Sequence, residues 1–487
     1  MNILLLSNSA PKYFHFFNAL AARFRNDGAT VAVAVDSAFS RKENGLDSAG
    51  FAAVYDFSSF FANHKVDFDI LERYSGYNLN SALLSDFERA QTYGIWGNSA
   101  DLDFFDRLKS ALLTFFERIF EKHGTEIVLY ENVSNTFAHF ALFVAQERRA
   151  VYIGLGASRL PGRFSVSGDP LADDSIERNF AAIRGGYKTV EPDVHRWVKD
   201  YIANIETIVP DYMKINGLER IALIKRYFRR DRLARIKALL RHVSDSRTNS
   251  FQIGNPLRTH TSLFLRNVRR RLKAGTVRGM YQKAVAGERF LLYPMHFHPE
   301  ASTSILAGAY LDEYEVIRNI AFSLPEGTRL YVKDHISAWA YPTLDFYRRI
   351  RSLPNVRLLG PHEPTKELIK SSVGVITLTS TVGYEALLLK KRVFLYGRVF
   401  YEFHKGVVPI ANPANLRRII SGGLASPIGW DDQYNHDFVC AYWLSTLPGT
   451  LNLMLDRVPA AQAAEHIYRE LLKAGLLHGL AAIKSAA

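Results

Sequence analysis

The stretch Thr377-Leu-Thr-Ser-Thr-Val-Gly-Tyr-Glu-Ala386, followed by Leu387-Leu-Leu-Lys-Lys-Arg-Val-Phe-Leu-Tyr-Gly397, indicates a strand, a tight polar turn, a helix and a second strand. The apolar run 373–378 is short and β-branched, which is typical of a buried parallel strand. Small hydroxyl residues follow where the helix begins, and the unpaired N–H groups of a helix N-terminus suit a phosphate. Because Ser and Thr are also ordinary helix caps, a phosphate seat and a plain cap both remain open for this turn.

The same alternation of strand and helix occurs in both halves of the chain, so we predict an α/β fold with two Rossmann-like lobes facing a cleft. In the first half, the expected strands are 3–6, 30–35, 127–130 and 150–154. In the second half, the expected strands are 290–293, 329–332, 356–359, 373–378 and 393–396. Residues 40–120 resemble helices and loops inserted in the first lobe. We therefore expect an N-terminal lobe over 1–165, a basic helical segment over 166–285, a C-terminal lobe over 286–430 and terminal helices over 431–487.

Composition narrows the class of protein. With 487 residues, 48% of them hydrophobic and 22% charged, the chain is long enough for two or more packed domains. The single cysteine, Cys440, excludes an internal disulfide and is expected to be a packed small residue in a reducing compartment. No apolar run reaches about 18 residues, so we expect no transmembrane helix. The chain enters a strand at Ile3 without a basic leader, so we expect a first strand rather than a signal peptide. We therefore also expect a cytoplasmic location.

The net charge is 61 − 48 = +13, which favours anionic partners. Part of this charge lies in residues 219–245, where basic residues alternate with apolar residues at near-helical spacing. This pattern predicts either a solvated helix face or peripheral docking to an anionic membrane surface, such as the inner membrane. We expect no nucleic-acid partner, because no recognisable binding motif accompanies the charge.

Three predicted strand ends of the second lobe carry polar groups, and ligands of such sheets bind at the carboxyl ends of strands. The segments are Tyr293-Pro-Met-His-Phe-His-Pro-Glu300, Lys333-Asp-His335 and the turn that holds Ser380, Thr381, Gly383 and Glu385. Together they predict a pocket for an anionic ligand, with Lys333 as a point charge, His298 and His335 as donors, and Ser380 at a helix N-terminus. We expect no metal in this pocket, because further ligands at zinc spacing are missing.

The first lobe offers acidic and basic candidates at its own strand ends. Glu131 follows the strand 127–130 and is the first candidate for an acid/base group, although a helix-capping carboxylate would look the same. Arg159 and Arg163, in the glycine-containing stretch after 150–154, could hold a carboxylate or phosphate. Asp169 lies just beyond them. The Gly-x-Gly of this stretch lacks the third glycine of a dinucleotide fingerprint.

Four motifs resemble those of bacterial capsular polysaccharide biosynthesis proteins, which are similar to the retaining β-Kdo glycosyltransferases of capsule and lipopolysaccharide assembly. These motifs are Tyr130-Glu-Asn-Val-Ser-Asn135, Ser158-Arg-Leu-Pro-Gly-Arg163, Tyr293-Pro-Met-His-Phe-His-Pro-Glu300 and Thr379-Ser-Thr-Val-Gly-Tyr-Glu-Ala386. The resemblance spans about 125–400. Residues 1–36 also resemble the start of a GT-B glycosyltransferase. It implies a GT-B architecture, a CMP-activated 3-deoxy-ulosonic acid donor, no cofactor, and a glycan or lipid-linked glycan acceptor.

Carried over by residue, the resemblance implies that the phosphate and carboxylate of the donor contact His298, Lys333 and His335. It also implies that Ser380, Thr381 and Glu385 seat the nucleotide, and that Glu131 and Asp169 are the acidic groups at the reacting centre. The family's Lys-Glu-His-Pro motif appears here as Lys333-Asp-His-Ile336, and the missing proline leaves the local turn to be explained. A carboxylate nucleophile would give retention through two displacements.

We therefore interpret the chain as a GT-B-like glycosyltransferase that uses a CMP-activated acidic sugar, Kdo, in surface polysaccharide synthesis. Two alternatives stay open. The Ser/Thr-Gly-x-Glu turn also serves UDP-sugar transferases and non-hydrolysing epimerases. The basic segment 219–245 would also suit a non-enzymatic, membrane-docked scaffold of polysaccharide export.

Overall fold

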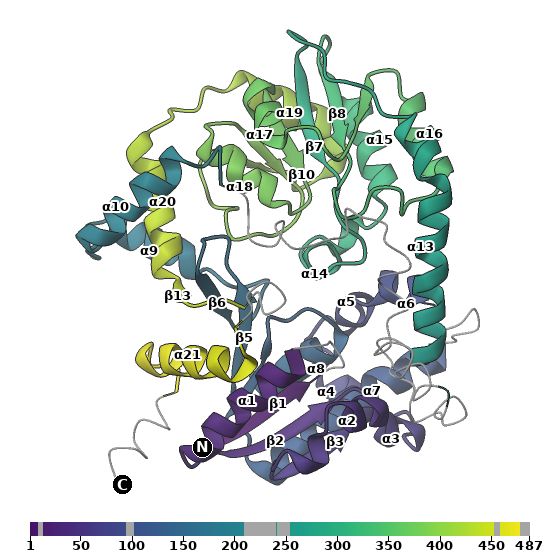
Figure 1. Ribbon diagram of the computed structural model, residues 1–487, viewed down its shortest axis with the longest axis vertical. Helices are drawn as coiled ribbons and strands as arrows, with labels where there is room; N and C mark the ends of the chain where they lie inside the picture. Colours follow the sequence, from purple (N-terminus) through teal and green to yellow (C-terminus); the bar gives the residue numbers. More distant parts are fainter. Residues whose placement is uncertain (8–12, 94–101, 209–239, 241–253, 452–457, 478–487) are drawn as a thin grey trace.

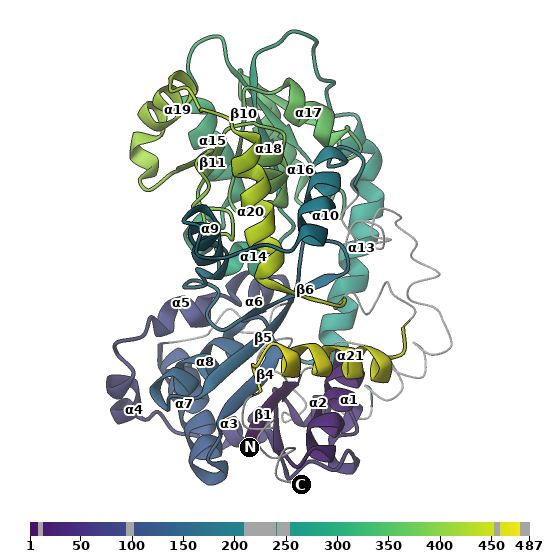
Figure 2. The same cartoon turned by 90° about the vertical axis from the view of Figure 1, so that its left-hand side faces the viewer.

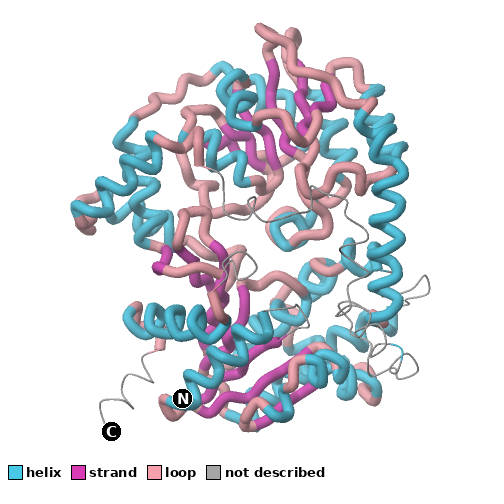
Figure 3. Tube along the Cα trace, viewed as in Figure 1, coloured by secondary structure: helices cyan, strands magenta, loops and turns pink. Residues whose placement is uncertain are grey.

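The computed structural model describes residues 1–7, 13–93, 102–208, 240, 254–451 and 458–477. It has two α/β lobes, one built mainly from the N-terminal third of the chain and the other from its C-terminal half (Figure 1). Each lobe contains one largely or wholly parallel sheet. Figure 3 shows helices beside the strands in both lobes. The predicted GT-B-like α/β fold with two Rossmann-like lobes is confirmed.

The first lobe contains a seven-stranded sheet in the order β13-β6-β5-β4-β1-β2-β3. Its strands are β1 (Asn2–Ser7), β2 (Thr30–Val35), β3 (Ala53–Asp56), β4 (Ile127–Glu131), β5 (Val151–Ala157), β6 (Arg163–Ser167) and β13 (Thr446–Pro448). The strands from β3 to β5 are parallel, in the Rossmann order 3-2-1-4-5, whereas β6 and β13 add two antiparallel pairings at the edge. Buried β-branched and Leu side chains in β1, β2 and β4 explain why these strands are central.

Helices cover both faces of the first sheet. They are α1 (Tyr13–Asn26), α2 (Ala38–Glu43), α3 (Phe57–Ala62), α4 (Phe68–Arg73), α5 (Leu79–Leu84), α6 (Phe87–Tyr93), α7 (Leu102–His123) and α8 (Thr136–Glu147). Helix α8 begins where Asn135 accepts a hydrogen bond from the backbone N–H of Ala138, at 2.9 Å. Phenylalanines from α3, α7 and α8 form one aromatic cluster in this core, and its members are Phe57, Phe115, Phe116 and Phe137.

The second lobe contains a six-stranded parallel sheet in the order β12-β11-β10-β7-β8-β9. Its strands are β7 (Phe290–Pro294), β8 (Arg329–Lys333), β9 (Val356–Leu359), β10 (Gly374–Thr377), β11 (Val393–Leu395) and β12 (Val407–Pro409). In chain order this is the full doubly wound pattern, so the order of strands reverses between β7 and β10. Crevices for ligands open at such a reversal, on the side of the carboxyl ends of the strands.

Two layers of helices cover the second sheet and build two hydrophobic cores. The helices of this lobe are α14 (Ala301–Ser304), α15 (Glu313–Ser323), α16 (Leu344–Ser352), α17 (Thr365–Ser371), α18 (Thr381–Leu388) and α19 (Leu416–Ala425). Helices α9 (Ser175–Arg184), α10 (Pro192–Ala203) and α20 (Asp432–Leu444) pack together, and their side chains complete the core on one face.

The chain passes between the lobes more than once (Figures 1 and 2). Helix α13 (Pro256–Arg278) contacts α6 of the first lobe and α16 of the second. After α20, strand β13 pairs with β6, and α21 (Ala460–Lys473) packs on α1. The expected segment 166–285 is thus divided in the structure, since α9 and α10 pack on the second lobe while α13 runs alongside both.

Most expected strands lie within two or three residues of the observed ones, and the differences have local causes. The sequence does not predict strands β3, β6, β12 and β13. They are short and lie at or near sheet edges, so they carry little periodic signal. In particular, the stretch 40–120 contains the edge strand β3 besides the expected helices. Among the described helices, none combines the length and the hydropathy needed to cross a bilayer. The basic segment 219–245 lies outside the described residues, apart from position 240.

Candidate active site

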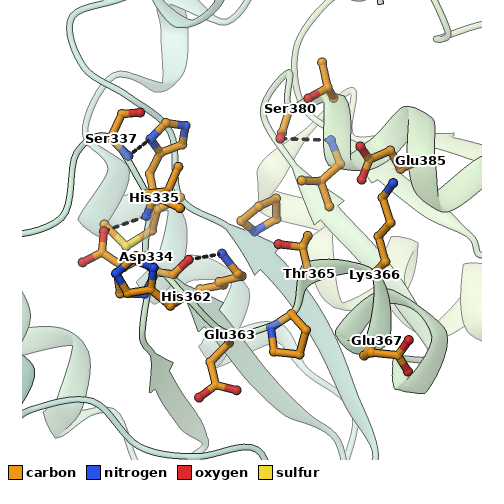
Figure 4. A pocket seen from close by; sticks show the side chains of 18 of the residues that line it. Asp334, His335, Ser337, His362, Glu363, Thr365, Lys366, Glu367, Ser380 and Glu385 are labelled. Atoms are coloured by element: carbon orange, nitrogen blue, oxygen red, sulfur yellow. Dashed lines mark hydrogen bonds between the residues drawn. The ribbon is translucent and has the colours of Figure 1, made fainter. Parts of the chain in front are cut away.

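A cavity of about 440 Å³ opens at the carboxyl ends of β7, β8, β9 and β10, next to the reversal of strand order. Figure 4 shows its two walls, with the segment after β8 facing the N-termini of α17 and α18. Five of the residues predicted from the sequence line this one cavity. They are Lys333, His335, Ser380, Thr381 and Glu385.

Lys333 ends strand β8 and is buried at the floor of the cavity. Its Nζ donates a hydrogen bond of 2.9 Å to the carbonyl oxygen of Pro361. Burial lowers the pKa of the Lys333 ammonium to about 8, although Asp334 and Glu363 oppose this shift. A buried ammonium at a cavity wall is poorly solvated, so an incoming anion gains more from it than from an exposed lysine.

His335 presents a neutral ring to the same cavity. Its Nδ1 accepts the backbone N–H of Ser337 at 3.2 Å, which leaves Nε2 as the protonated, donating nitrogen. Burial, together with the positive charges nearby, lowers the pKa of His335 to about 4. The ring is therefore a hydrogen-bond donor near neutral pH without carrying a charge.

Asp334 explains how this loop holds its shape without the proline of the family motif. Its carboxylate accepts hydrogen bonds from the hydroxyls of Tyr281 and Tyr347, at 2.6 and 2.8 Å, and from the backbone N–H of His335, at 2.7 Å. Burial raises the pKa of Asp334 to about 6. The carboxylate thus anchors the turn, and Asp334 lines the cavity together with its neighbours Lys333 and His335.

The N-terminus of α18 forms part of the opposite wall. Ser380 caps the helix, since its Oγ accepts the N–H of Val382 at 3.2 Å, while its own N–H donates to Thr377 Oγ1 at 3.1 Å. Helix α17 begins at the same cavity with Thr365. Two helix N-termini therefore direct their partial positive charge toward one space.

Gly383 lies outside the lining of the cavity and has a packing role. A Cβ atom at this position would lie 2.4 Å from Tyr401 Oη. That hydroxyl donates to the carbonyl oxygen of Ser380 at 2.6 Å. The glycine therefore lets Tyr401 brace the turn from behind, and its predicted contact with a donor stays a prediction.

Glu385 and Lys366 complete the wall beside Ser380 (Figure 4). Burial raises the pKa of Glu385, and the charges of Lys366 and Arg159 partly offset the rise. Lys366 Nζ donates to the carbonyl oxygens of Ile205 and Ile208, which fixes the end of the segment after α10 against α17. Sequence reasoning missed Lys366, His362 and Thr365, although all three follow the predicted strand 356–359 and could have been found at that strand end.

A second, smaller cavity of about 210 Å³ lies between the lobes, and Thr381 lines both cavities. Arg159 and Asn132 line it from the first lobe, and Arg159 donates its backbone N–H to Tyr442 Oη at 2.8 Å. Thr379 also lines this cavity, and its Oγ1 is buried and has no hydrogen-bond partner among the described residues. Such a hydroxyl is a candidate contact for a ligand.

The two predicted catalytic acids flank this cavity without lining it. Glu131 accepts the hydroxyl of Ser134 at 3.0 Å, and burial raises its pKa, while its neighbour Asn132 reaches the cavity. Asp169 accepts the N–H of Leu171 at 2.9 Å in a tight turn. The structure thus places both carboxylates one residue away from cavity-lining positions, and their catalytic roles stay predictions.

His298 takes a position that differs from the expected donor pocket. Its Nδ1 lies 2.9 Å from Glu88 Oε1 of helix α6, so it joins the two lobes. Burial opposes protonation, but the hydrogen bond with Glu88 and the charges of Glu313 and Glu88 outweigh it and raise the pKa of His298. This contact could not be anticipated from the sequence, because the two residues are 210 positions apart.

Residues 231–411 match the family model described as capsule polysaccharide biosynthesis protein. The match includes α13 and the strands β7 to β12, and hence most residues of the 440 Å³ cavity. The family resemblance predicted from the motifs is confirmed for this part of the chain. No curated protein matches the chain in sequence.

Solved structures with a similar arrangement include two transferases and an epimerase. The "beta Kdo 2,7 transferase" of Thermosulfurimonas dismutans KpsC is 13% identical, with 74% of this chain and 89% of that chain covered and a TM-score of 0.33. The corresponding "beta Kdo 2,4 transferase" is 15% identical, with 68% and 86% covered and a TM-score of 0.35. The UDP-GlcNAc 2-epimerase of Methanocaldococcus jannaschii is 10% identical, with 91% and 99% covered and a TM-score of 0.29. The fold assignment rests on the sheet topology, because these likenesses are distant.

Proposed function

We propose that this protein is a glycosyltransferase of capsule polysaccharide assembly, which transfers an acidic sugar, Kdo, from a CMP-activated donor to a glycan or glycolipid acceptor. The observation that carries the proposal is the 440 Å³ cavity, where Lys333, His335 and two helix N-termini converge at a topological switch point. The match of residues 231–411 to the capsule family supports the same assignment.

The chemistry follows from the bond that breaks. Cleavage of the bond between the sugar and the phosphate develops positive charge on the sugar carbon and negative charge on the leaving CMP. The ammonium of Lys333 and the Nε2–H of His335 are donors that would stabilise this leaving phosphate, and the partial positive charge at the start of α18 would add to their effect. Because they are fixed by Pro361, Ser337 and Ser380, they need little reorganisation during the reaction.

The acidic sugar would occupy the space between the lobes, next to the shared residue Thr381. Arg159 offers a positive charge there for the sugar carboxylate, and the Thr379 hydroxyl, which has no partner within the described part of the chain, offers a further hydrogen bond. Glu131 and Asp169 are the proposed acidic groups at the reacting centre. With a carboxylate nucleophile the transfer retains the configuration of the sugar through two displacements.

The test is release of CMP from freshly generated CMP-Kdo, measured with and without an extract containing lipid-linked acceptor. Acceptor-dependent release is expected in the wild type and should be lost in Lys333→Ala. A panel of nucleotides in a thermal-shift assay accompanies it. Stabilisation by UDP but not by CMP would overturn the CMP assignment and favour a UDP-sugar transferase or epimerase.

We propose in addition that the basic segment 219–245 docks the protein on an anionic membrane surface, where a glycolipid acceptor would be presented. The proposal is based on the sequence, in which Lys225, Arg226, Arg229 and Arg230 lie among apolar residues. Exchange of these four residues for Glu should abolish sedimentation with anionic liposomes, and unchanged binding would contradict docking through this segment.

A further inference from the structure

Three side chains with metal-binding atoms meet between helices α10 and α20, and none of them lines the two cavities. His195 comes from α10, whereas His436 and Cys440 lie four residues apart on α20. Their ligand atoms all lie within 4.8 Å of one another. Cys440 is buried, and both histidines are half-buried, so the cluster can be reached from solvent.

Taken in pairs, the side chains lie at distances close to those of a coordination sphere, and His436 faces its two neighbours with different ring nitrogens. His195 Nδ1 lies 3.5 Å from His436 Nε2, and Cys440 Sγ lies 3.9 Å from His195 Nδ1 and 3.7 Å from His436 Nδ1. A tetrahedral zinc ion, with Zn–S of about 2.3 Å and Zn–N of about 2.0 Å, separates its ligand atoms by roughly 3.3 to 3.6 Å. With one ligand atom from each residue, the atoms lie within 4.8 Å of one another, so His436 must turn a single nitrogen toward both partners before the three side chains can share one ion.

The main movement is a rotation of the His436 ring. The two imidazole rings are stacked nearly parallel, with an interplanar angle of 9° and 5.0 Å between centroids. A metal ion lies in the plane of each imidazole that binds it, so the His436 ring must rotate about its Cβ–Cγ bond when it binds. The contacts of His436 Nε2 with Nδ1 and the carbonyl oxygen of His195, at 3.5 and 3.4 Å, are weak and oppose this rotation little.

We propose that His195, His436 and Cys440 form a binding site for a thiophilic transition-metal ion of the zinc class, which ties helix α10 to helix α20. A thiolate and two imidazoles favour zinc, cobalt or copper over magnesium or calcium, which prefer oxygen ligands. Binding exchanges the thiol proton of Cys440 for the ion and leaves a fourth position for water.

The neighbouring carboxylate of Asp437 is already engaged. Its Oδ1 accepts from Gln433 Nε2 at 2.7 Å, and its Oδ2 from Arg184 at 3.2 Å. Its Oδ1 lies 3.8 Å from His436 Nδ1. Because both of its oxygens already accept hydrogen bonds, we do not count Asp437 as a ligand, and the three named side chains supply the ligands.

The position of the site connects it to the proposed donor cavity. The chain leaves α10 at Ala203, and the carbonyl oxygens of Ile205 and Ile208 then accept hydrogen bonds from Lys366 in the cavity wall. Two residues beyond Cys440, Tyr442 accepts the backbone N–H of Arg159 at the inter-lobe cavity. An ion that joins α10 and α20 would thus brace a wall of each cavity from behind.

The experiment uses the full chain without a polyhistidine tag, treated with a chelator and then titrated with Co²⁺. We expect one ion per chain and a thiolate-to-cobalt charge-transfer band in the near ultraviolet. The band should be lost in Cys440→Ser, and His195→Gln should lose the stoichiometric binding. A rise in Tm on addition of Zn²⁺ should occur in the wild type and be absent from both variants.

A second cluster variant and a control variant make the outcome of the metal titration unambiguous. His195→Gln changes a half-buried residue, so it keeps the test valid if Cys440→Ser fails to fold. His466→Gln, on the exposed face of α21, is the matched control and should keep both the band and the Tm rise. No charge-transfer band in the wild type, or a band that survives in both cluster variants, would overturn the proposal. These readouts are independent of transferase activity, so they stand apart from the proposed function.

Discussion

At the scale of single residues, Lys333 supplies a buried positive charge to the candidate site. It is a buried cation of the 440 Å³ cavity, and its Nζ hydrogen-bonds to a backbone carbonyl, so the ammonium keeps donors for a ligand. The neutral His335 beside it adds a donor without adding charge repulsion. This pairing suits a phosphate that must be bound and then released as the charge of the leaving group changes.

We predict that binding of CMP weakens as the pH rises above about 8, because burial lowers the pKa of Lys333 to about 8 and the deprotonated amine loses its attraction for phosphate. Lys333→Gln should weaken binding by about 1.5–3 kcal/mol below that pH, the value of a charge-assisted hydrogen bond, and should remove the pH dependence. Isothermal titration calorimetry on either side of pH 8 measures both effects.

Lys391 supplies the matched control for this prediction. It is also partly buried, has a pKa lowered by burial, and donates to a carbonyl oxygen, that of Ser372, at 3.0 Å, but it lies outside both cavities. Lys391→Gln should leave the affinity for CMP and its pH dependence unchanged. An identical pH dependence in Lys333→Gln and the wild type would refute the role of Lys333.

How much of the site can be predicted depends on where each residue stands relative to a strand end. Lys333, His335 and Ser380 follow strands with strong apolar signals, and parallel strands bring such positions to one edge of the sheet. The contact of His298 with Glu88 and the meeting of His195 with His436 join residues far apart in the chain, for which a single sequence holds no signal. The packing role of Gly383 is equally hidden, because the need for a glycine comes from a tyrosine that approaches from another loop.

At the scale of elements, helix α18 depends on the close approach of Tyr401 behind its first turn. We predict that Gly383→Ala destabilises the protein by about 1–3 kcal/mol, the usual cost of overpacking, because the new Cβ would displace Tyr401 from the carbonyl of Ser380. The affinity for CMP should fall as well, since the turn that holds Ser380 loses its brace. Chemical denaturation and calorimetry measure the two losses.

The control lies in α19, where a Cβ atom added at Gly422 would have no atom of the described residues within 4 Å, apart from its chain neighbours and the backbone of its own helix. Gly422→Ala should stabilise the protein by up to about 1 kcal/mol, because alanine is the better helix former. Tyr401→Phe in the Gly383→Ala background should recover part of the stability by removing the hydroxyl that makes the closest contact. If Gly383→Ala proved as stable as Gly422→Ala, the bracing role of Tyr401 would be wrong.

The elements themselves are predictable where the pattern is long. Strands 30–35 and 356–359 have in the structure the same bounds that their apolar patterns predict. Strand β13 is three residues long and ends in Pro448, and it pairs only at the sheet edge, so neither periodicity nor propensity marks it. The predicted terminal helices over 431–487 therefore correspond to α20 and α21, with an unpredicted strand between them.

At the scale of the whole molecule, the two lobes are interlocked by the C-terminal part of the chain. Ile467 and Leu471 of α21 are fully buried in the core of the first lobe. In the sequence, the whole second sheet lies between α21 and strands β1 to β6 of that lobe. The hydroxyl of Tyr468 donates a hydrogen bond to the carboxylate of Asp27, just after α1. Integrity of the first lobe thus depends on residues more than four hundred positions away.

We predict that Ile467→Ala lowers the free energy of unfolding by about 2–5 kcal/mol, as expected for a large-to-small change in a packed core. The loss should appear in the first lobe, so hydrogen exchange should rise in β1, β2 and α1 more than in β7 or β10. Gln462→Ala, on the exposed side of the same helix, should change neither quantity. Equal exchange in the two lobes of Ile467→Ala would contradict the assignment of α21 to the first core.

The late pairing of β13 with β6 also has a consequence for biosynthesis. While the chain emerges from the ribosome, the N-terminal sheet ends in β6 as an open edge, which can pair with other strands. That edge stays uncovered until residues 446–448 have been translated, by which time the whole second sheet is available to fold. The lobe that is synthesised first is therefore the one that is completed last, and nascent chains released early would carry an aggregation-prone edge.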